Sequence, residues 1–472
     1  MRQAASSAGV GYRGKARRGP AAAVLLCLLT AASLAGTLLT GGLRAQAGAF
    51  MGVASCSGST CHGRAEGNGA VVRQDEIAAW QEFSSPTGAH SRALALLSGA
   101  RGRAIAATLG LGNAASAPAC LGCHATSIRG GAGEGARGAK FLTSDGVGCE
   151  SCHGPAGGWL AVHYTRAATH ASNVANGMVP LERPQVRANV CLDCHWGSAK
   201  GNQFVTHEMM AAGHPRLSFE LDLFSSLQQH HAEDADYVRR KGRTDSVRLW
   251  AVGQAEAVRR QTDLFARPDY GSRGVFPEFY FLDCHSCHRA IADGPQRKLT
   301  FETNPGRPIR FGNPPFNDEN MILLGAVARS LAPGEAAGFD RASRTFHAAF
   351  ADGRGSAQQA ALALRERAGA LSAALAARSF PATDAFEIIA TVAGEATRPR
   401  FTDYAGSVQA VMAVDTLLNA LVREGRVTVG AAAGIRASIN RAYAAVETPG
   451  GYRPDEFRAS LAQAARAVGA LK

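Results

Sequence analysis

Five short clusters of cysteine and histidine are the residues of this sequence best suited to chemistry. Four of them read CLGCH, CESCH, CLDCH and CHSCH. The remaining one, CSGSTCH, comes first in the chain and has two more residues between its cysteines. In this order, two thiols can add across two vinyl groups of a haem while the adjacent imidazole ligates the iron. We number these motifs from first to fifth in chain order: Cys56, Cys61 and His62; Cys120, Cys123 and His124; Cys149, Cys152 and His153; Cys191, Cys194 and His195; Cys284, Cys287 and His288.

Three other uses of paired cysteines compete with haem attachment. These are a disulfide framework, zinc sites built from CxxC pairs, and a thioredoxin-like redox pair. None of them explains why a histidine directly follows the second cysteine in every motif. We therefore expect five covalently attached c-type haems, with the ten motif cysteines as attachment points and the five motif histidines as proximal iron ligands.

Nine further histidines are available as distal ligands, and most lie between the first and fifth motifs. An iron with two imidazole ligands needs one of them in addition to its proximal histidine. We expect this role for His90, His163, His207 and His214. The neighbours His230 and His231 can supply at most one ligand to a given iron and are not assigned. His170 and His285 are also left unassigned, and His347 is expected at the surface.

The first 47 residues have the pattern of an export signal. They contain six basic and no acidic residues, an apolar run over 20–43, and small residues at the end. We predict a signal peptide over 1–47, with an uncleaved membrane anchor through 20–43 as the alternative, and a periplasmic or extracellular protein. The full chain has a formal charge of +12, but residues 48–472 keep 44 basic against 38 acidic residues. Basic and aromatic residues do not interleave, so we expect no nucleic-acid partner.

The sequence also resembles a known family. The segments GVASCSGSTCHG, EIAAW, GAHSRAL, DGVGCESCHGPAGG and NGMVPLERPQVRANVCLDCH are similar to those of multihaem cytochromes c typified by the tetrahaem cytochrome of ammonia oxidisers, which accepts electrons from hydroxylamine oxidoreductase. The resemblance covers about 50–200 well and extends loosely to about 290. It implies closely packed, mostly bis-histidine haems, one of which can be five-coordinate. The fifth motif and the long C-terminal region depart from that family.

The chain divides by composition near residue 317. We predict a mainly α protein: a pentahaem cytochrome c domain of helices and loops around stacked haems over 48–316, then an antiparallel helical bundle over 317–472. The second part lacks cysteine and carries apolar residues at helical spacing, such as Leu364, Leu371 and Leu375. Ser356 and Thr402 are expected as N-caps and Gly425 as a C-terminal stop. The bundle is expected to pack on the haem domain or to form a homo-oligomer.

These patterns favour an electron carrier that works between a donor and an acceptor redox protein. Two imidazoles on an iron leave no position for substrate, so such a haem transfers electrons. One alternative is an enzyme that reduces or oxidises small nitrogen compounds at a five-coordinate haem. Pentahaem nitrite reductases, which the chain resembles in outline, commonly use a proximal lysine, whereas all five motifs here end in histidine. A second alternative is a subunit of an extracellular conducting assembly.

Overall fold

The computed structural model describes residues 48–67, 73–128, 137–200, 203–216, 218–231, 233–271, 277–288, 306–310, 313–381, 383–398 and 404–472. Within these ranges the chain is built from helices and loops, and its only β pairing is two isolated bridges, Phe50 with Arg137 and Leu282 with Phe316. The prediction of a mainly α protein is confirmed. The predicted signal peptide, the anchor segment 20–43 and Thr402 lie outside the described residues.

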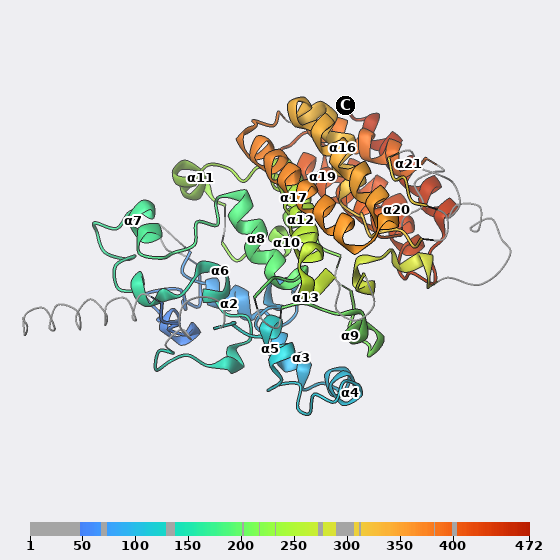
Figure 1. Cartoon of the computed structure of the whole chain (residues 1–472). Helices are drawn as coiled ribbons and strands as arrows, with labels where there is room; N and C mark the ends of the chain where they lie inside the picture. The colour runs from blue at the N-terminus through green and yellow to red at the C-terminus, as the bar shows by residue number, and fades with distance from the viewer. Residues whose placement is uncertain are drawn as a thin grey trace, which may run out of the picture.

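The N-terminal part consists of short helices joined by long irregular segments (Figure 1). Its helices are η1 Val53–Ser55, α2 Glu76–Gln81, η2 Pro86–Gly88, α3 Ala93–Leu97, α4 Ala100–Thr108, α5 Pro118–His124, η3 Thr143–Asp145, α6 Glu150–His153, η4 Ala156–Gly158, α7 His170–Ala175, α8 Pro184–His195, α9 His207–Ala211, α10 Leu221–Leu227 and α11 Ala235–Lys241. Proline at the first position starts α5 and α8, where its missing N–H costs nothing.

A long helix, α12 (Ser246–Ala266), connects this part to the rest of the molecule. The side chain of Asp245 caps its start by accepting a hydrogen bond from the N–H of Arg248. The helix is buried on nearly all sides and packs against α8 and α10 on one side and against α15, α17 and α19 on the other. It lies inside the segment expected only as helices and loops around haems, so this helix was not predicted as a separate element.

After α12, the short helices α13 Pro268–Gly271, η5 Phe279–Phe281 and η6 Cys284–Ser286 lead to a bundle of long helices, drawn in yellow to red in Figure 1. The bundle comprises α15 Met321–Leu331, α16 Pro333–Ala349, η7 Phe350–Asp352, α17 Arg354–Ala377, α18 Thr383–Ala396, α19 Tyr404–Arg423, α20 Val429–Ala445 and α21 Pro454–Gly469. Consecutive pairs such as α16 with α17 and α20 with α21 lie side by side.

Two of the expected helix ends can be compared with the structure. Gly425 lies two residues after the end of α19 and has φ 69°, as a glycine just past a helix C-terminus should. The expected cap at Ser356 is wrong, because α17 begins at Arg354 after Gly353, whose φ of 102° ends the preceding turn. Ser356 therefore lies inside the first turn. The predicted stripe of Leu364, Leu371 and Leu375 is buried.

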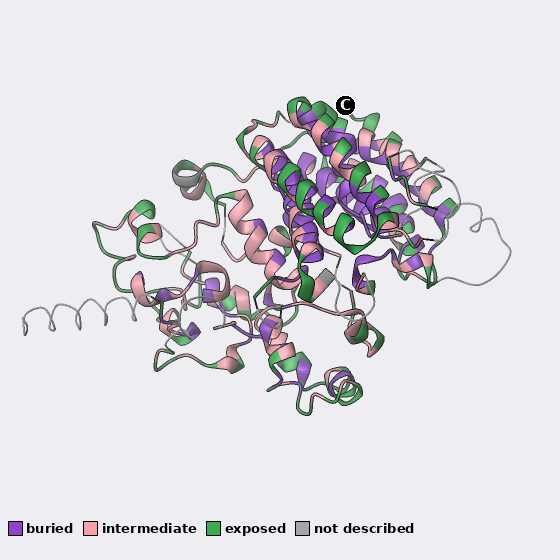
Figure 2. Ribbon diagram, in the orientation of Figure 1, coloured by how far each residue is buried: buried purple, intermediate pink, exposed green. Residues whose placement is uncertain are grey.

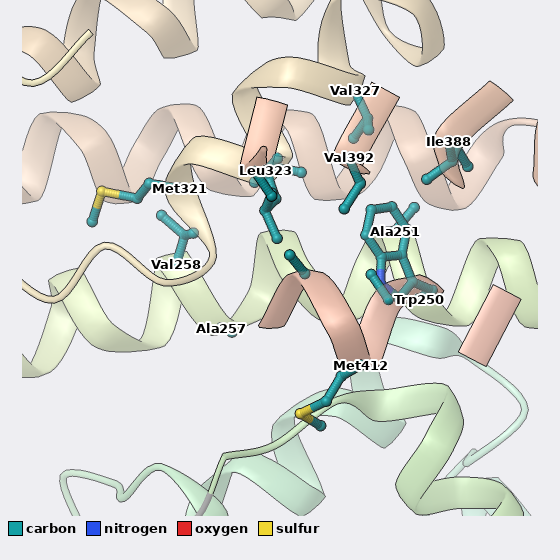
Figure 3. Packing of buried hydrophobic residues seen from close by; sticks show 14 of the residues in the cluster. Trp250, Ala251, Ala257, Val258, Met321, Leu323, Val327, Ile388, Val392 and Met412 are labelled. Carbon is teal, nitrogen blue, oxygen red and sulfur yellow. The ribbon is translucent and has the colours of Figure 1, made fainter. Parts of the chain in front are cut away.

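One apolar core runs through α8, α10, α12 and the whole bundle (Figure 2). Figure 3 shows side chains from α12, α15, α18 and α19 meeting around Trp250, which is fully buried. Helix α19 is long and apolar enough to cross a membrane, but 83% of its apolar window is buried inside the bundle, as in the central helix of a packed core. The N-terminal part adds only a small second cluster around Leu97, Ala106 and Cys120 in the residues described.

A buried polar segment, Asn317 to Asn320, precedes α15. Within it Asp318 lies 2.5 Å from the Arg307 guanidinium and 3.2 Å from Nε2 of His347. The expectation that His347 is a surface residue is therefore wrong: its side chain is buried against this carboxylate. Burying an acid is costly unless it is paired, and Arg307 supplies that pairing.

We expect Phe265→Ala to reduce the free energy of unfolding by about 3–5 kcal/mol, because it leaves a cavity in the core. The Phe265 ring is fully buried and contacts the rings of Phe281, Phe316 and Phe346 at centroid distances of 5.4–5.6 Å. Denaturant unfolding followed by circular dichroism measures the change. Leu362→Ala, at an exposed position of α17, serves as the control and should change little. Equal effects of the two substitutions would contradict the packing described.

The stability should also depend on the buried Glu220. Burial and the neighbouring Asp222 carboxylate raise the pKa of Glu220 from 4.5 to about 7. The folded state therefore holds this proton more tightly than the unfolded state. The contribution of Glu220 to stability should be greatest below pH 4.5 and should fall by up to about 3 kcal/mol as the pH rises to about 7. Glu220→Gln should flatten this slope in unfolding experiments, whereas exposed Glu366→Gln should not; an unchanged slope in Glu220→Gln would refute the assignment.

Candidate haem sites

The five motifs lie at the ends of short helices or in tight turns. Helices α5, α6 and α8 each end on the histidine of their motif, His124, His153 and His195. In the fifth motif, η6 begins at Cys284, and the N–H of His288 donates to the Cys284 carbonyl. The longer first motif closes by two backbone hydrogen bonds, from Cys61 to Gly58 and from His62 to Cys56. Each motif thus places its two thiols and its imidazole on one compact turn.

All ten motif cysteines are free thiols, so the described chain has no disulfide framework. The first cysteine of each CxxC pair also lacks the lowered pKa of a thioredoxin-like nucleophile. Burial raises the pKa of Cys120 and Cys284 and brings that of Cys191 to about 12, while a hydrogen bond with Cys56, together with burial, raises the pKa of Cys149. These thiols are neutral at physiological pH. The described residues also hold no group of cysteines arranged to bind a zinc ion.

Each proximal histidine faces another histidine across a nearly constant distance. Four of the ring pairs are His62 with His163 at 6.3 Å, His195 with His90 at 6.2 Å, His124 with His214 at 6.3 Å, and His288 with His207 at 6.1 Å between centroids. Two metal–nitrogen bonds of about 2 Å each, together with the ring radii, place opposite imidazoles on one metal about 6 Å apart. The spacing of these pairs therefore fits an iron between the rings.

The third motif has two histidines opposite its own. His153 lies 6.4 Å from the ring of His230 and 6.1 Å from that of His231. Nitrogens of these three rings lie within 4.8 Å of one another. Neither neighbour was predicted as a ligand from the sequence, because adjacent residues give no local signal for which one faces the motif.

The Nδ1 atom of five of these rings is held by an oxygen, which leaves Nε2 for a metal. Nδ1 of His124 bonds the Ala93 carbonyl at 2.8 Å, and Nδ1 of His62 contacts the Glu76 carboxylate at 3.0 Å. Backbone carbonyls hold three further rings: that of Leu160 holds His163, that of Pro215 holds His214, and that of Gln228 holds His230. Such partners orient metal-binding imidazoles and fix their tautomer.

Burial keeps several of these rings neutral, which is the form that binds a metal. It lowers the pKa of His195 and of His230 to about 4 and also lowers the pKa of His90 and His214. His62 differs, because the Glu76 carboxylate raises its pKa. Nδ1 of His195 is buried without a hydrogen-bond partner among the described residues, and its ring packs on Phe219 with centroids 5.0 Å apart.

Two unassigned histidines lie away from these pairs. His170 is exposed and contacts Glu182 at 3.0 Å. His285 is buried, and its Nδ1 bonds the Pro449 carbonyl at 2.8 Å. Neither ring is paired with a proximal histidine in the described structure.

Contacts between motifs bring the sites close together. Glu150, inside the third motif, accepts hydrogen bonds from the N–H groups of Met51 and Gly52 just before the first motif. The thiols of Cys123 and Cys194, from the second and fourth motifs, also lie in contact, and each sulfur is 3.9 Å from a carbonyl oxygen of the other motif.

Two contacts connect the fifth motif to the others. The guanidinium of Arg216 lies 3.6 Å from Sγ of Cys284 and 5.9 Å from the ring of Trp196, which follows the fourth motif. Helix α9 and the turn after it carry both His207 and His214, which face the fifth and second motifs. Helix α6 of the third motif also packs against α8, which carries the fourth motif, so the five sites form one connected group.

Residues 55–154 match the family model described as cytochrome c554 and c-prime. The match supports a multihaem c-type cytochrome family. It also supports covalently bound c-type haem and a role in electron transfer. The matched segment contains the first three motifs and His90, whereas the fourth and fifth motifs of this chain lie beyond it and repeat the same geometry. Neither the curated proteins nor the solved structures contain a match.

From the facing pairs we expect that removal of a distal histidine opens the sixth position of one iron. In His163→Ala the iron at the first motif should lose its sixth ligand, because His163 is the ring opposite His62. We expect the reduced protein to bind one carbon monoxide per molecule, seen in the difference spectrum. His170→Ala removes an exposed histidine and should bind none. If His163→Ala binds no carbon monoxide, this pairing is wrong.

Proposed function

We propose that the protein is an exported pentahaem c-type cytochrome that carries electrons between a donor and an acceptor redox protein. The observation that carries this proposal is the repeated pairing: every proximal histidine has a second histidine about 6 Å away. Haem c supplies reversible one-electron chemistry at iron. The ten motif cysteines would attach the haems, and the histidines would ligate them.

The protein's own groups suit an electron carrier because they hold both axial positions. Carbonyls hold Nδ1 of His124, His163 and His214, and a carboxylate holds Nδ1 of His62, so these four rings present Nε2. Ligands fixed in this way change little between oxidation states, which favours fast electron transfer. The contacts between neighbouring motifs support the proposal further, because electrons can pass only between sites that lie close together.

The pairings favour the carrier over both alternatives. A reductase or oxidase of small nitrogen compounds needs an iron with an open position, and a conducting assembly that shares ligands between chains needs a motif without a partner in its own chain. In the described structure each proximal histidine has an intrachain partner. The match over residues 55–154 supports a multihaem c-type cytochrome family, and kinship with the tetrahaem cytochromes of ammonia oxidisers remains part of the proposal.

The other parts of the proposal rest on the sequence. Residues 1–47 would direct export as a cleaved signal or stay as an anchor through 20–43. The haem domain would span 48–316 and the bundle 317–472. The surface of the bundle is the candidate face for a homo-oligomer.

Haem counting and ligand binding test the proposal together. The pyridine haemochrome of the purified protein should give five haems per chain, and the reduced protein should bind neither carbon monoxide nor nitric oxide. Stepwise reduction should remove all five ferric signals without a substrate. A count of four haems would mean that the first motif does not bind haem. Stoichiometric binding of nitric oxide at one iron would instead support a reductase or oxidase of small nitrogen compounds.

A further inference from the structure

One carboxylate, Glu76, lies between histidines that belong to two different sites. Its Oε2 is 3.0 Å from Nδ1 of His62, and its Oε1 is 3.4 Å from Nδ1 of His231. Glu76 starts α2 and is buried, with 5% of its surface exposed. The carboxylate therefore contacts the proximal ring of the first motif and a ring that faces the third.

At the third motif, distance alone does not decide which of His230 and His231 would be the distal ligand. His230 and His231 both face His153 at about the same distance, yet an iron with His153 on one side has a single position left. Nδ1 of His230 bonds the carbonyl of Gln228, two residues away in its own loop. Nδ1 of His231 instead points to Glu76, so the two rings differ in the oxygen that supports them.

We propose that Glu76 is a shared positioning residue that selects His231, and not His230, as the distal ligand of the third motif while it orients His62 in the first. The inference rests on the proposed function, because both histidines act on haem iron. Glu76 touches no iron itself and acts through the two rings.

The carboxylate oxygen Oε1 of Glu76 favours His231 over His230 as the distal ligand. Oε1 of Glu76 is buried and makes no hydrogen bond of normal geometry in the described structure. A buried carboxylate oxygen without a partner is costly. When a metal binds Nε2 of His231, its Nδ1–H becomes a stronger donor, and the 3.4 Å contact can shorten to satisfy Oε1. Ligation by His230 would leave Oε1 without that gain, because the partner of His230 is a backbone carbonyl.

A shared carboxylate also couples the two sites energetically. An anionic acceptor on Nδ1–H makes an imidazole a stronger donor to the metal, which stabilises the oxidised iron. Glu76 should therefore hold two of the five reduction potentials low. Removing its charge should raise both of them together and leave the other three in place.

The first test is spectroelectrochemical titration of Glu76→Gln. Two of the five transitions should move to higher potential, and Asp75→Asn should move none. Asp75 is a matched control because it neighbours Glu76 but pairs with Arg73 and contacts neither histidine. If no transition or only one transition moves in Glu76→Gln, Glu76 does not act on both sites and the proposal is overturned.

The second test removes each candidate ligand in turn. Reduced His231→Ala should bind one carbon monoxide per molecule, and reduced His230→Ala should bind none. The selection is overturned if His230→Ala opens the site, or if both variants stay closed because either ring can replace the other. Failure of the proposed function would appear in the wild-type protein, as fewer than five haems or as an open iron, whereas failure of this inference appears only in the variants.

Discussion

The spacing between two imidazole rings, 6.1–6.4 Å from centroid to centroid, is the constraint on which every candidate site depends. A metal between two such rings tolerates little error in their distance or in the nitrogen that each presents. The chain meets this requirement with short helices that end on the proximal histidine and with oxygens that hold Nδ1. The irregular segments between these helices bring in the distal rings. The short helices and irregular segments of the N-terminal part are therefore suited to this task, because they can place each ring opposite its partner.

The two parts of the molecule reach their stability in different ways. The bundle has a continuous apolar core, whereas the described N-terminal part has only a small apolar cluster. Under the proposed function, five macrocycles would complete the packing of the N-terminal part at the density of a protein interior. Helix α12 joins the two parts, because it packs on α8, which carries the fourth motif, and on α17 in the bundle. The bundle would thus act as a rigid support for the fourth motif.

The sequence allowed prediction of what is local in the chain. The motifs were readable because thiols and imidazole lie within one turn, and the buried stripe of α17 followed from helical spacing. The partner of each proximal histidine was not readable, because His163 meets His62 and His90 meets His195 only after the loops fold. Helix α12 has apolar residues at helical spacing, but it was not predicted as a separate element, because the segment around the motifs was expected only as helices and loops around haems. The error at His347 has a similar cause, since the buried Asp318 that holds it lies in another segment.

The contacts of Glu76 are another feature that could not be predicted from the local sequence. Nothing in the EIAAW segment indicates that its acid contacts rings from two sites, because His231 comes from a distant loop. The two functions of that acid, orientation of one ring and choice of another, arise only from tertiary structure. Polar groups of this kind are often where folded proteins adjust the chemistry of a bound metal.

Near-infrared magnetic circular dichroism of the oxidised protein tests the central claim most directly, because its charge-transfer bands report the pair of axial ligands on each low-spin haem. Bis-histidine ligation at all five motifs should give a single class of band, that of two histidines, with an intensity equal to five haems per chain. A band from a high-spin iron or from any other ligand pair, or an intensity equal to fewer than five bis-histidine haems, would contradict it.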